Sequence, residues 1–371
     1  MAKLRIGPTR PQRISPGRLL PQIWERRIVR TIRFVAAMLV LAAILQANSA
    51  VELRTGATSA SPFASAIESL AEKLETEYIF PNVGAEYART LRHKLASGTY
   101  ASIGDPAEIS RILTADLQAV APDGHLRLKP TGLQHANPAS PSVGESPPIR
   151  EAKWIAPGIA YISFGIVPDD PKTIAEINAF MRAHASARTL IIDARQDHGG
   201  GIEGVDALFG YLYSARQVVG YMDENKAALT KDDLDSPNPP TIRQVPAAKG
   251  LVRYEHSIIP NDDDTSLRKI RVFYLTSGQT ASAGEYMASI LKKTGRATLV
   301  GERTKGDNHF GFFVPLGEDL SVFLPWGRIS DPASGEDWEG KGIMPDVVVP
   351  ADTALAEAMR KANAVNQLPG R

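Results

Sequence analysis

The chain of 371 residues contains no cysteine. This absence excludes disulfides, thiol nucleophiles and cysteine-ligated metal sites. An excess of charge of one sign is also lacking, because 42 Lys and Arg oppose 41 Asp and Glu. A net charge of +1 gives no electrostatic case for binding nucleic acid. No HExxH helix, P-loop or dinucleotide fingerprint occurs, so the sequence implies no metal and no nucleotide cofactor.

No apolar run is long enough for a comfortable membrane span of ~20 residues, but the N-terminus is unusual. Residues 1–33 hold nine Lys or Arg and a single acid, and the uncharged apolar run Phe34–Leu45 follows. A basic segment, a short apolar segment and then small residues predict an export signal within residues 1–50, cleaved near Ser49 or Ala50. An uncleaved inner-membrane anchor is the alternative. Either way the remainder of the chain is expected outside the cytoplasm, in the periplasm of a bacterium.

Composition and hydrophobic periodicity divide the remaining chain into parts. Residues 61–128 contain three short amphipathic segments and predict a small helical domain that opens with a hydroxyl cap at Ser61. Residues 129–150 are rich in Pro, Ser and Gly and predict a linker or exposed loop. Residues 151–352 are expected to form the second domain, and residues 353–371 a short helical tail.

The second domain alternates strand-like and helix-like segments. Residues 189–196 (TLIIDARQ) read as a strand before a helix, and Ile270–Leu275 precedes the helix-like Tyr286–Lys293 in the same order. This alternation predicts an α/β core with some parallel pairing. Residues 223–266 are polar and Pro-rich, which predicts hairpins and loops, with His256 in loop-like sequence.

Two turns follow predicted strands and are expected to meet at one edge of the sheet. The first, IIDARQDHGGG, bears three glycines that let main-chain N–H groups point at a ligand. The second, TSGQTASAGE, places Ser282 at a helix N-terminus, where the dipole favours a developing negative charge. A serine there caps a helix more often than it attacks a substrate, and a weakly nucleophilic hydroxyl needs a base. Local sequence does not select that base among seven histidines.

A resemblance supplies the selection. The segment from TSGQTASAGE to ERTKG looks like the nucleophile segment of the tail-specific, or C-terminal processing, serine proteases. IIDARQDHGGG resembles that family's Asp-x-Arg-x-Asn-x-Gly-Gly turn, with Asp197 in place of the asparagine, and GKGIMPD resembles its Gly-[Val/Ile]-x-Pro-Asp element. The front end, with EYIFPN and APDGHL, is similar to the subgroup of interphotoreceptor retinoid-binding protein repeats and the tricorn protease core. The resemblance implies an α/β core of crotonase-like ββα repeats behind the helical domain.

The resemblance also implies roles for individual residues. Ser282 would be the nucleophile, with an oxyanion hole from the N–H of Ala283 and of Gly199 or Gly200. Enzymes of the family with a Ser–Lys dyad place lysine 25 residues after the serine, but this chain has Asp307 there. A carboxylate is a poor substitute for a neutral lysine base.

The tricorn-like pattern fits better. It makes His125 the base and Glu339 the carboxylate that completes the network, although Gly124 replaces the serine that bridges them in that pattern. Asp123 is interpreted as a turn residue, and Asp193 with Arg195 as a structural charged pair at a strand end.

The sequence therefore predicts an exported serine peptidase that acts on a peptide or protein substrate. Only about thirty residues separate the helical front from the core, too few for the PDZ domain that many relatives carry. A noncatalytic protein that binds a hydrophobic ligand or a peptide on the same scaffold is the alternative. An esterase is disfavoured, because Ser282 lies in no G-x-S-x-G elbow.

Overall fold

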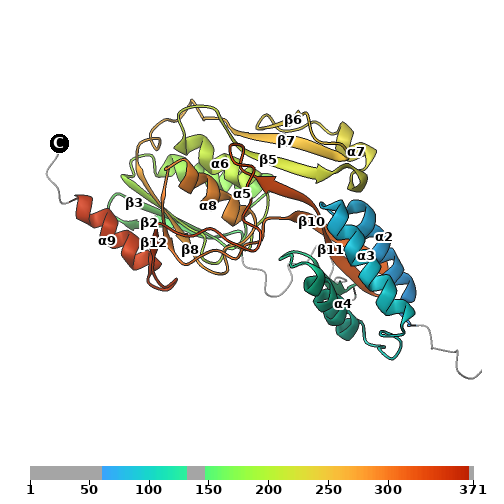
Figure 1. Cartoon of the computed structure of the whole chain (residues 1–371). Helices are drawn as coiled ribbons and strands as arrows, with labels where there is room; N and C mark the ends of the chain where they lie inside the picture. The colour runs from blue at the N-terminus through green and yellow to red at the C-terminus, as the bar shows by residue number, and fades with distance from the viewer. Residues whose placement is uncertain (1–60, 132–146, 367–371) are drawn as a thin grey trace, which may run out of the picture. The chain divides into compact units, whose positions relative to one another are not determined.

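The structure, a computed structural model, describes residues 61–131 and 147–366. The predicted export signal lies outside these residues. Within them, no helix is both long and apolar enough to cross a membrane. The described chain combines helices with two six-stranded sheets, as the predicted α/β class requires (Figure 1).

The first sheet contains the predicted parallel core. Its strands run in the order β12-β9-β8-β4-β3-β2, and only the β2–β3 pair is antiparallel. These strands are β2 (Ile149–Ala156), β3 (Ile159–Phe164), β4 (Thr189–Asp193), β8 (Arg271–Thr276), β9 (Thr298–Gly301) and β12 (Val347–Val348). All five residues of β4 are buried, because helices cover both faces of the sheet.

Helices lie on opposite faces of this sheet (Figure 1), and each face has its own hydrophobic layer. Leu190 and Ile192 point to one layer, whereas Ile191 points to the other, as the period-2 geometry of a strand demands. The first layer is built with α5 (Pro171–Ala183), α6 (Glu203–Leu212) and α8 (Ala283–Lys293). The second is built with α9 (Ala354–Asn366), whose alanines at 354, 358 and 362 recur at helical spacing.

The front end forms three helices, as predicted. They are α2 (Ala64–Glu77), α3 (Pro81–Ala96) and α4 (Pro106–Val120). The side chain of Asp105 accepts hydrogen bonds at the N-terminus of α4. The predicted cap at Ser61 is wrong, because Phe63 holds the N-cap position of α2 and the Ser61 hydroxyl accepts from the Phe63 N–H at 3.2 Å.

The second sheet is antiparallel throughout its described pairs and packs against the front helices. It runs β1-β11-β5-β7-β6, with β10 also paired to β11. Its strands are β1 (Arg127–Pro130), β5 (Gln217–Asn225), β6 (Ile242–Val245), β7 (Leu251–Ile258), β10 (Phe310–Gly317) and β11 (Leu320–Ser330). The short helices η2 (Lys226–Ala228) and α7 (Lys231–Asp235) lie between β5 and β6.

Strand β1 decides where the site forms. It follows α4 and pairs with β11, so the exit of the helical segment is fixed to a sheet of the core. Both ends of the predicted linker are strands, since β1 reaches Pro130 and β2 begins at Ile149. Residues 131–148 between them fall far short of the roughly 50 residues of a small domain. The division into domains at 128 and 151 stays a prediction.

The expectation of a loop around His256 is wrong. This residue lies in β7 and is fully buried, where its Nδ1 lies 2.7 Å from the Tyr286 hydroxyl and its Nε2 lies 2.7 Å from Asp206 Oδ1. Its ring therefore serves the packing of β7 against α6 and α8.

Candidate active site

Ser282 occupies a strained turn between β8 and α8. It is the N-cap residue of α8 with φ 51° and ψ −118°. A positive φ is uncommon for a residue other than glycine and persists only where the surroundings enforce it. The Ser282 N–H donates to Glu285 Oε2 at 3.1 Å, which is one of those constraints.

Glu285 connects this turn to the loop after β9, a role that no motif in the sequence predicted. It is fully buried and accepts from the Thr304 hydroxyl at 2.6 Å, the Gly306 N–H at 2.7 Å and the Asp307 N–H at 2.8 Å. Burial raises the pKa of Glu285, and these hydrogen bonds oppose the rise. One carboxyl group therefore fixes the loop at 304–307 against the turn that bears Ser282.

The glycine turn meets the serine turn. Gly199 has φ +103°, and a Cβ at this position would lie 2.6 Å from the Cβ of Ser282, so only glycine fits. The Gly199 N–H already donates to Asp197 Oδ1 at 2.9 Å. The N–H groups of Gly200 and Ala283 have no hydrogen-bond acceptor within residues 61–131 and 147–366. These two N–H groups, rather than that of Gly199, can still donate a hydrogen bond to a ligand.

Asp197, in the place of the family's asparagine, lies beneath this turn. Its Oδ2 would be 2.8 Å from a Cβ at Gly284, in the first turn of α8. The side chain is fully buried, and burial raises its pKa from 3.8 to about 8. At pH 7 the group is therefore mostly a neutral acid, and it accepts the Gly199 N–H as an asparagine oxygen would.

His125 follows the exit turn of α4. The side chain is 8% exposed, and its ring stacks on Phe323 with centroids 5.1 Å apart. The main-chain N–H groups of His125 and Leu126 donate to Asp123 Oδ1 at 2.9 and 3.0 Å. Burial lowers the pKa of His125 to about 4, so the imidazole is neutral at pH 7. Its Nδ1 is buried without a partner, and no hydrogen bond joins the ring to Ser282 in the described chain.

Glu339 holds the main chain beside His125 rather than its ring. Glu339 Oε1 accepts from the Gly124 N–H at 2.9 Å, and Oε2 accepts from the N–H groups of Asn308 and His309 at 2.6 and 3.1 Å. Burial raises the pKa of Glu339. The carboxylate thus reaches the residue before His125 through the peptide N–H, although Gly124 lacks the bridging hydroxyl.

Asp123 does more than the turn interpretation assigned to it. It is 1% exposed, and its Oδ2 lies 2.7 Å from His309 Nδ1 and accepts from the Tyr78 hydroxyl at 2.8 Å. Burial alone would lower the pKa of His309, but the Asp123 carboxylate raises it overall. Oxygen and nitrogen atoms of Asp123, His309 and Glu339 lie within 4.8 Å of one another. A cation there would have to break the Asp123–His309 hydrogen bond.

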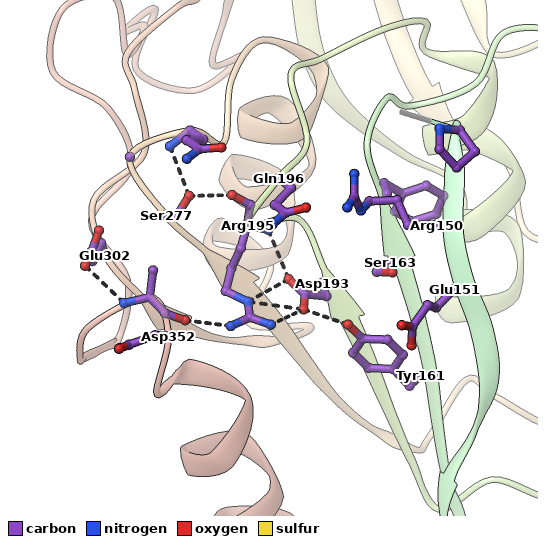
Figure 2. A pocket seen from close by; sticks show the side chains of 15 residues that line it. Arg150, Glu151, Tyr161, Ser163, Asp193, Arg195, Gln196, Ser277, Glu302 and Asp352 are labelled. Atoms are coloured by element: carbon purple, nitrogen blue, oxygen red, sulfur yellow. Dashed lines mark hydrogen bonds and ion pairs between the residues drawn. The ribbon is translucent and has the colours of Figure 1, made fainter. Parts of the chain in front are cut away.

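A cavity of about 920 Å³ opens at the ends of β3, β4 and β8 (Figure 2). Arg195 makes a bidentate ion pair with Asp193, with the closest N–O distance 2.6 Å, and donates to the Ala351 carbonyl at 2.7 Å. These contacts agree with a structural charged pair. Gln279 lines the cavity, but Ser282 and His125 do not, so this cavity is separate from the predicted catalytic groups.

Comparisons with known proteins identify the family of the chain. The model of Peptidase family S41 matches residues 158–349, slightly more than half of the chain. The model of the N-terminal domain of Peptidase S41 in eukaryotic IRBP matches residues 42–154, in agreement with the predicted resemblance of the front end.

The chain is also similar to individual proteins. A carboxy-terminal-processing protease of Bartonella bacilliformis is 36% identical over 78 residues, which cover 21% of this chain and only 18% of that protein. A candidate peptidase of Parabacteroides merdae shares the fold with a TM-score of 0.55 at 17% identity, over 80% of this chain and 95% of that one. A lipoprotein of Streptococcus agalactiae shares it with a TM-score of 0.53 at 14% identity, over 81% and 97%. The chain belongs to peptidase family S41.

Proposed function

We propose that the protein is an exported serine-type peptidase in which Ser282 attacks the substrate carbonyl and His125 is the general base. The observation that carries the proposal is the contact between two turns distant in sequence. The would-be Cβ of Gly199 lies 2.6 Å from the Cβ of Ser282, beside the unpaired N–H groups of Gly200 and Ala283. A serine next to two N–H groups without acceptors supplies the nucleophile and the oxyanion hole that acyl transfer uses.

The chemistry would proceed in two steps. The Ser282 oxygen forms a bond to the peptide carbonyl carbon while its proton passes to His125 Nε2. The N–H groups of Gly200 and Ala283 donate to the resulting oxyanion, each worth roughly 3–4 kcal/mol when well placed. The C–N bond then breaks as the proton moves to the departing amine. Water next attacks the acyl-serine ester, with His125 taking and returning one proton, and releases the acid.

The state of His125 supports its role. Its lowered pKa, about 4, keeps the ring unprotonated at neutral pH, so it can accept the serine proton. The proposal includes a closure in which the imidazole reaches Ser282 on substrate binding, because catalytic hydrogen bonds are often long or absent without substrate. Asp123 accepts the main-chain N–H of His125, and Glu339 accepts that of Gly124, so both carboxylates hold the turn that bears the ring.

Labelling with a fluorophosphonate probe tests the nucleophile. The wild type is expected to react, and Ser282→Ala and His125→Ala are expected to lose labelling and peptide hydrolysis by more than about a thousandfold. Ser289→Ala is the matched control, because this buried serine lies within α8, away from the turn at its N-terminus. Persistent labelling of Ser282→Ala would refute the assignment. A folded wild type that neither labels nor hydrolyses peptides would favour a noncatalytic ligand-binding protein, a role with which the missing Ser282–His125 hydrogen bond agrees.

The proposal of export depends on the sequence of residues 1–50. The basic segment followed by Phe34–Leu45 is typical of a signal. N-terminal sequencing of the protein recovered from the periplasm is expected to begin near Ser49 or Ala50. A protein that retains Met1 and sediments with the inner membrane would instead indicate the anchored alternative.

A further inference from the structure

Gly124 and Asp307, two of the residues that depart from the family's patterns, lie against each other. A Cβ at Gly124 would be 2.1 Å from Asp307 Oδ1 and 2.9 Å from its Cγ. A serine at position 124 could not coexist with the carboxylate in this place. The missing side chain at 124 therefore makes room for the carboxylate at 307, and the two departures form one arrangement.

The Asp307 carboxylate is held rather than mobile. The residue is 3% exposed, and Oδ2 lies 2.5 Å from Lys305 Nζ. Its main-chain N–H donates to Glu285 Oε2, the same oxygen that accepts from Ser282 N–H. The position of Asp307 is thus tied through one buried carboxyl group to the turn that bears the proposed nucleophile.

The ring of His125, the residue next to Gly124, has a nitrogen atom without a hydrogen-bond partner. Its Nδ1 is buried with no hydrogen-bond partner, and Asp307 Oδ1 accepts no hydrogen bond in the described chain. A buried polar atom without a partner is costly, and a catalytic role is one of the explanations for such an atom in a folded protein. Four charged side chains act on His125: Asp307, Asp123, Arg127 and Lys305. Asp307 exerts the largest of these effects and raises the pKa of His125 against the lowering by burial.

We propose that Asp307 is the positioning residue for His125, and this inference rests on the proposed function. As Ser282 transfers its proton to Nε2, the Nδ1–H of His125 donates to Asp307 Oδ1. The carboxylate fixes the tautomer and stabilises the imidazolium until the proton passes to the departing amine. Asp307 neither gains nor loses a proton. An acid thus occupies the chain position of the dyad lysine but supports a histidine instead of acting as the base.

Kinetics of Asp307→Asn test this role. The amide keeps the shape but not the charge, so kcat is expected to fall about 10²- to 10⁴-fold while KM changes little. Loss of the negative charge also lowers the pKa of His125. The acidic limb of the pH profile, where kcat/KM falls because His125 becomes protonated, therefore moves to lower pH. Asp307→Glu keeps the charge and is expected to retain the wild-type limb. It also serves as the test variant if Asp307→Asn does not fold, since a shifted limb in Asp307→Glu would count against the role.

Lys305→Met is the matched control, because it removes the ion pair and keeps the carboxylate. Lys305 lowers the pKa of His125, so this variant is expected to move the acidic limb to higher pH, opposite to Asp307→Asn. Its kcat should stay within about threefold of the wild type, since the side chain is half exposed. A merely structural Asp307 would leave the kcat of a folded Asp307→Asn variant close to the wild-type value.

A double-mutant cycle tests the contact between positions 124 and 307. Gly124→Ser alone is expected to destabilise the protein through overlap with the carboxylate, and Gly124→Ser with Asp307→Gly is expected to regain most of that loss. Additive effects would refute the shared arrangement.

Different experimental results would refute the proposed function and the inference about Asp307. Absence of labelling in the wild type would remove the proposed function. A reactive wild type that needs Ser282 and His125, with kcat and pH limb unchanged in Asp307→Asn, would overturn only the inference about Asp307.

Discussion

Replacing Asp197 by asparagine should abolish a specific pH dependence of stability. The folded protein holds this carboxyl group fully buried, with Oδ1 accepting the Gly199 N–H and Oδ2 unpartnered in the described chain. Burial raises its pKa from 3.8 to about 8. Between these two values the unfolded chain loses the proton while the folded protein keeps it. The free energy of unfolding therefore falls as the pH rises through this window.

The magnitude follows from linkage. Each pH unit inside the window can lower the free energy of unfolding by at most about 1.4 kcal/mol, so the step from pH 5 to pH 8 is bounded near ~4 kcal/mol. Entry of water and local relaxation reduce such values, and we expect roughly 2–3 kcal/mol. The amide side chain of the Asp197→Asn variant cannot ionise and offers an oxygen to the same N–H. Relative to the wild type, the variant should gain stability steadily from pH 5 to pH 8.

Urea unfolding at pH 5, 6, 7 and 8 measures this difference. The difference in unfolding free energy between wild type and variant, plotted against pH, isolates the contribution of Asp197, because other buried acids contribute equally to both proteins. Asp263→Asn, which changes an exposed acid, is the control and should give a difference near zero at every pH. Parallel curves for wild type and Asp197→Asn would refute the argument, since they would mean that the folded protein holds Asp197 ionised.

The geometry leads to three further predictions. Gly199→Ala should lower probe labelling by more than about a hundredfold, because its Cβ would lie 2.6 Å from the Ser282 Cβ and φ is +103°. The kcat/KM for peptide hydrolysis should stay level from pH 8 to pH 6 and fall only toward pH 4, where His125 gains a proton and can no longer accept one from the serine. Asn225→Ala should cost about 1–3 kcal/mol of unfolding free energy, because Nδ2 of Asn225 donates to two carbonyl groups at the end of α2 at 3.0 and 2.9 Å.

Each of these three predictions has a control variant or a result that would contradict it. Gly278→Ala adds a methyl group to the same serine turn, where nothing lies within 4 Å, and should label normally. If it loses labelling as Gly199→Ala does, the steric explanation is wrong. A pH limb near 6.5 would show that His125 titrates as an exposed histidine does. Asn178→Ala, which removes one hydrogen bond within α5, should cost less than Asn225→Ala; equal losses would contradict the role of Asn225 in joining β5 to α2.

Local patterns in the sequence predicted the elements well where one period dominates. The strand expected at Ile270–Leu275 is β8 at Arg271–Thr276, and the helix expected to begin at Tyr286 begins three residues earlier. Prediction failed at His256, because the polar sequence around β7 is typical of a loop, whereas β7 is a strand held by pairing with β5 and β6. It also failed at Ser61, where serine before proline is typical of a cap but the helix begins later.

The sequence alone determined the family and the order of strand, turn and helix, and it predicted which residues react, because periodicity, turn composition and motif spacing are local properties of the chain. Only the tertiary structure decided which carboxyl group serves which turn. Glu339 bonds the Gly124 N–H across 215 positions, and Asp307 fills the space that a side chain at 124 would need. These partners are chosen by three-dimensional packing and by the requirement that buried polar groups find hydrogen bonds, which no linear spacing encodes.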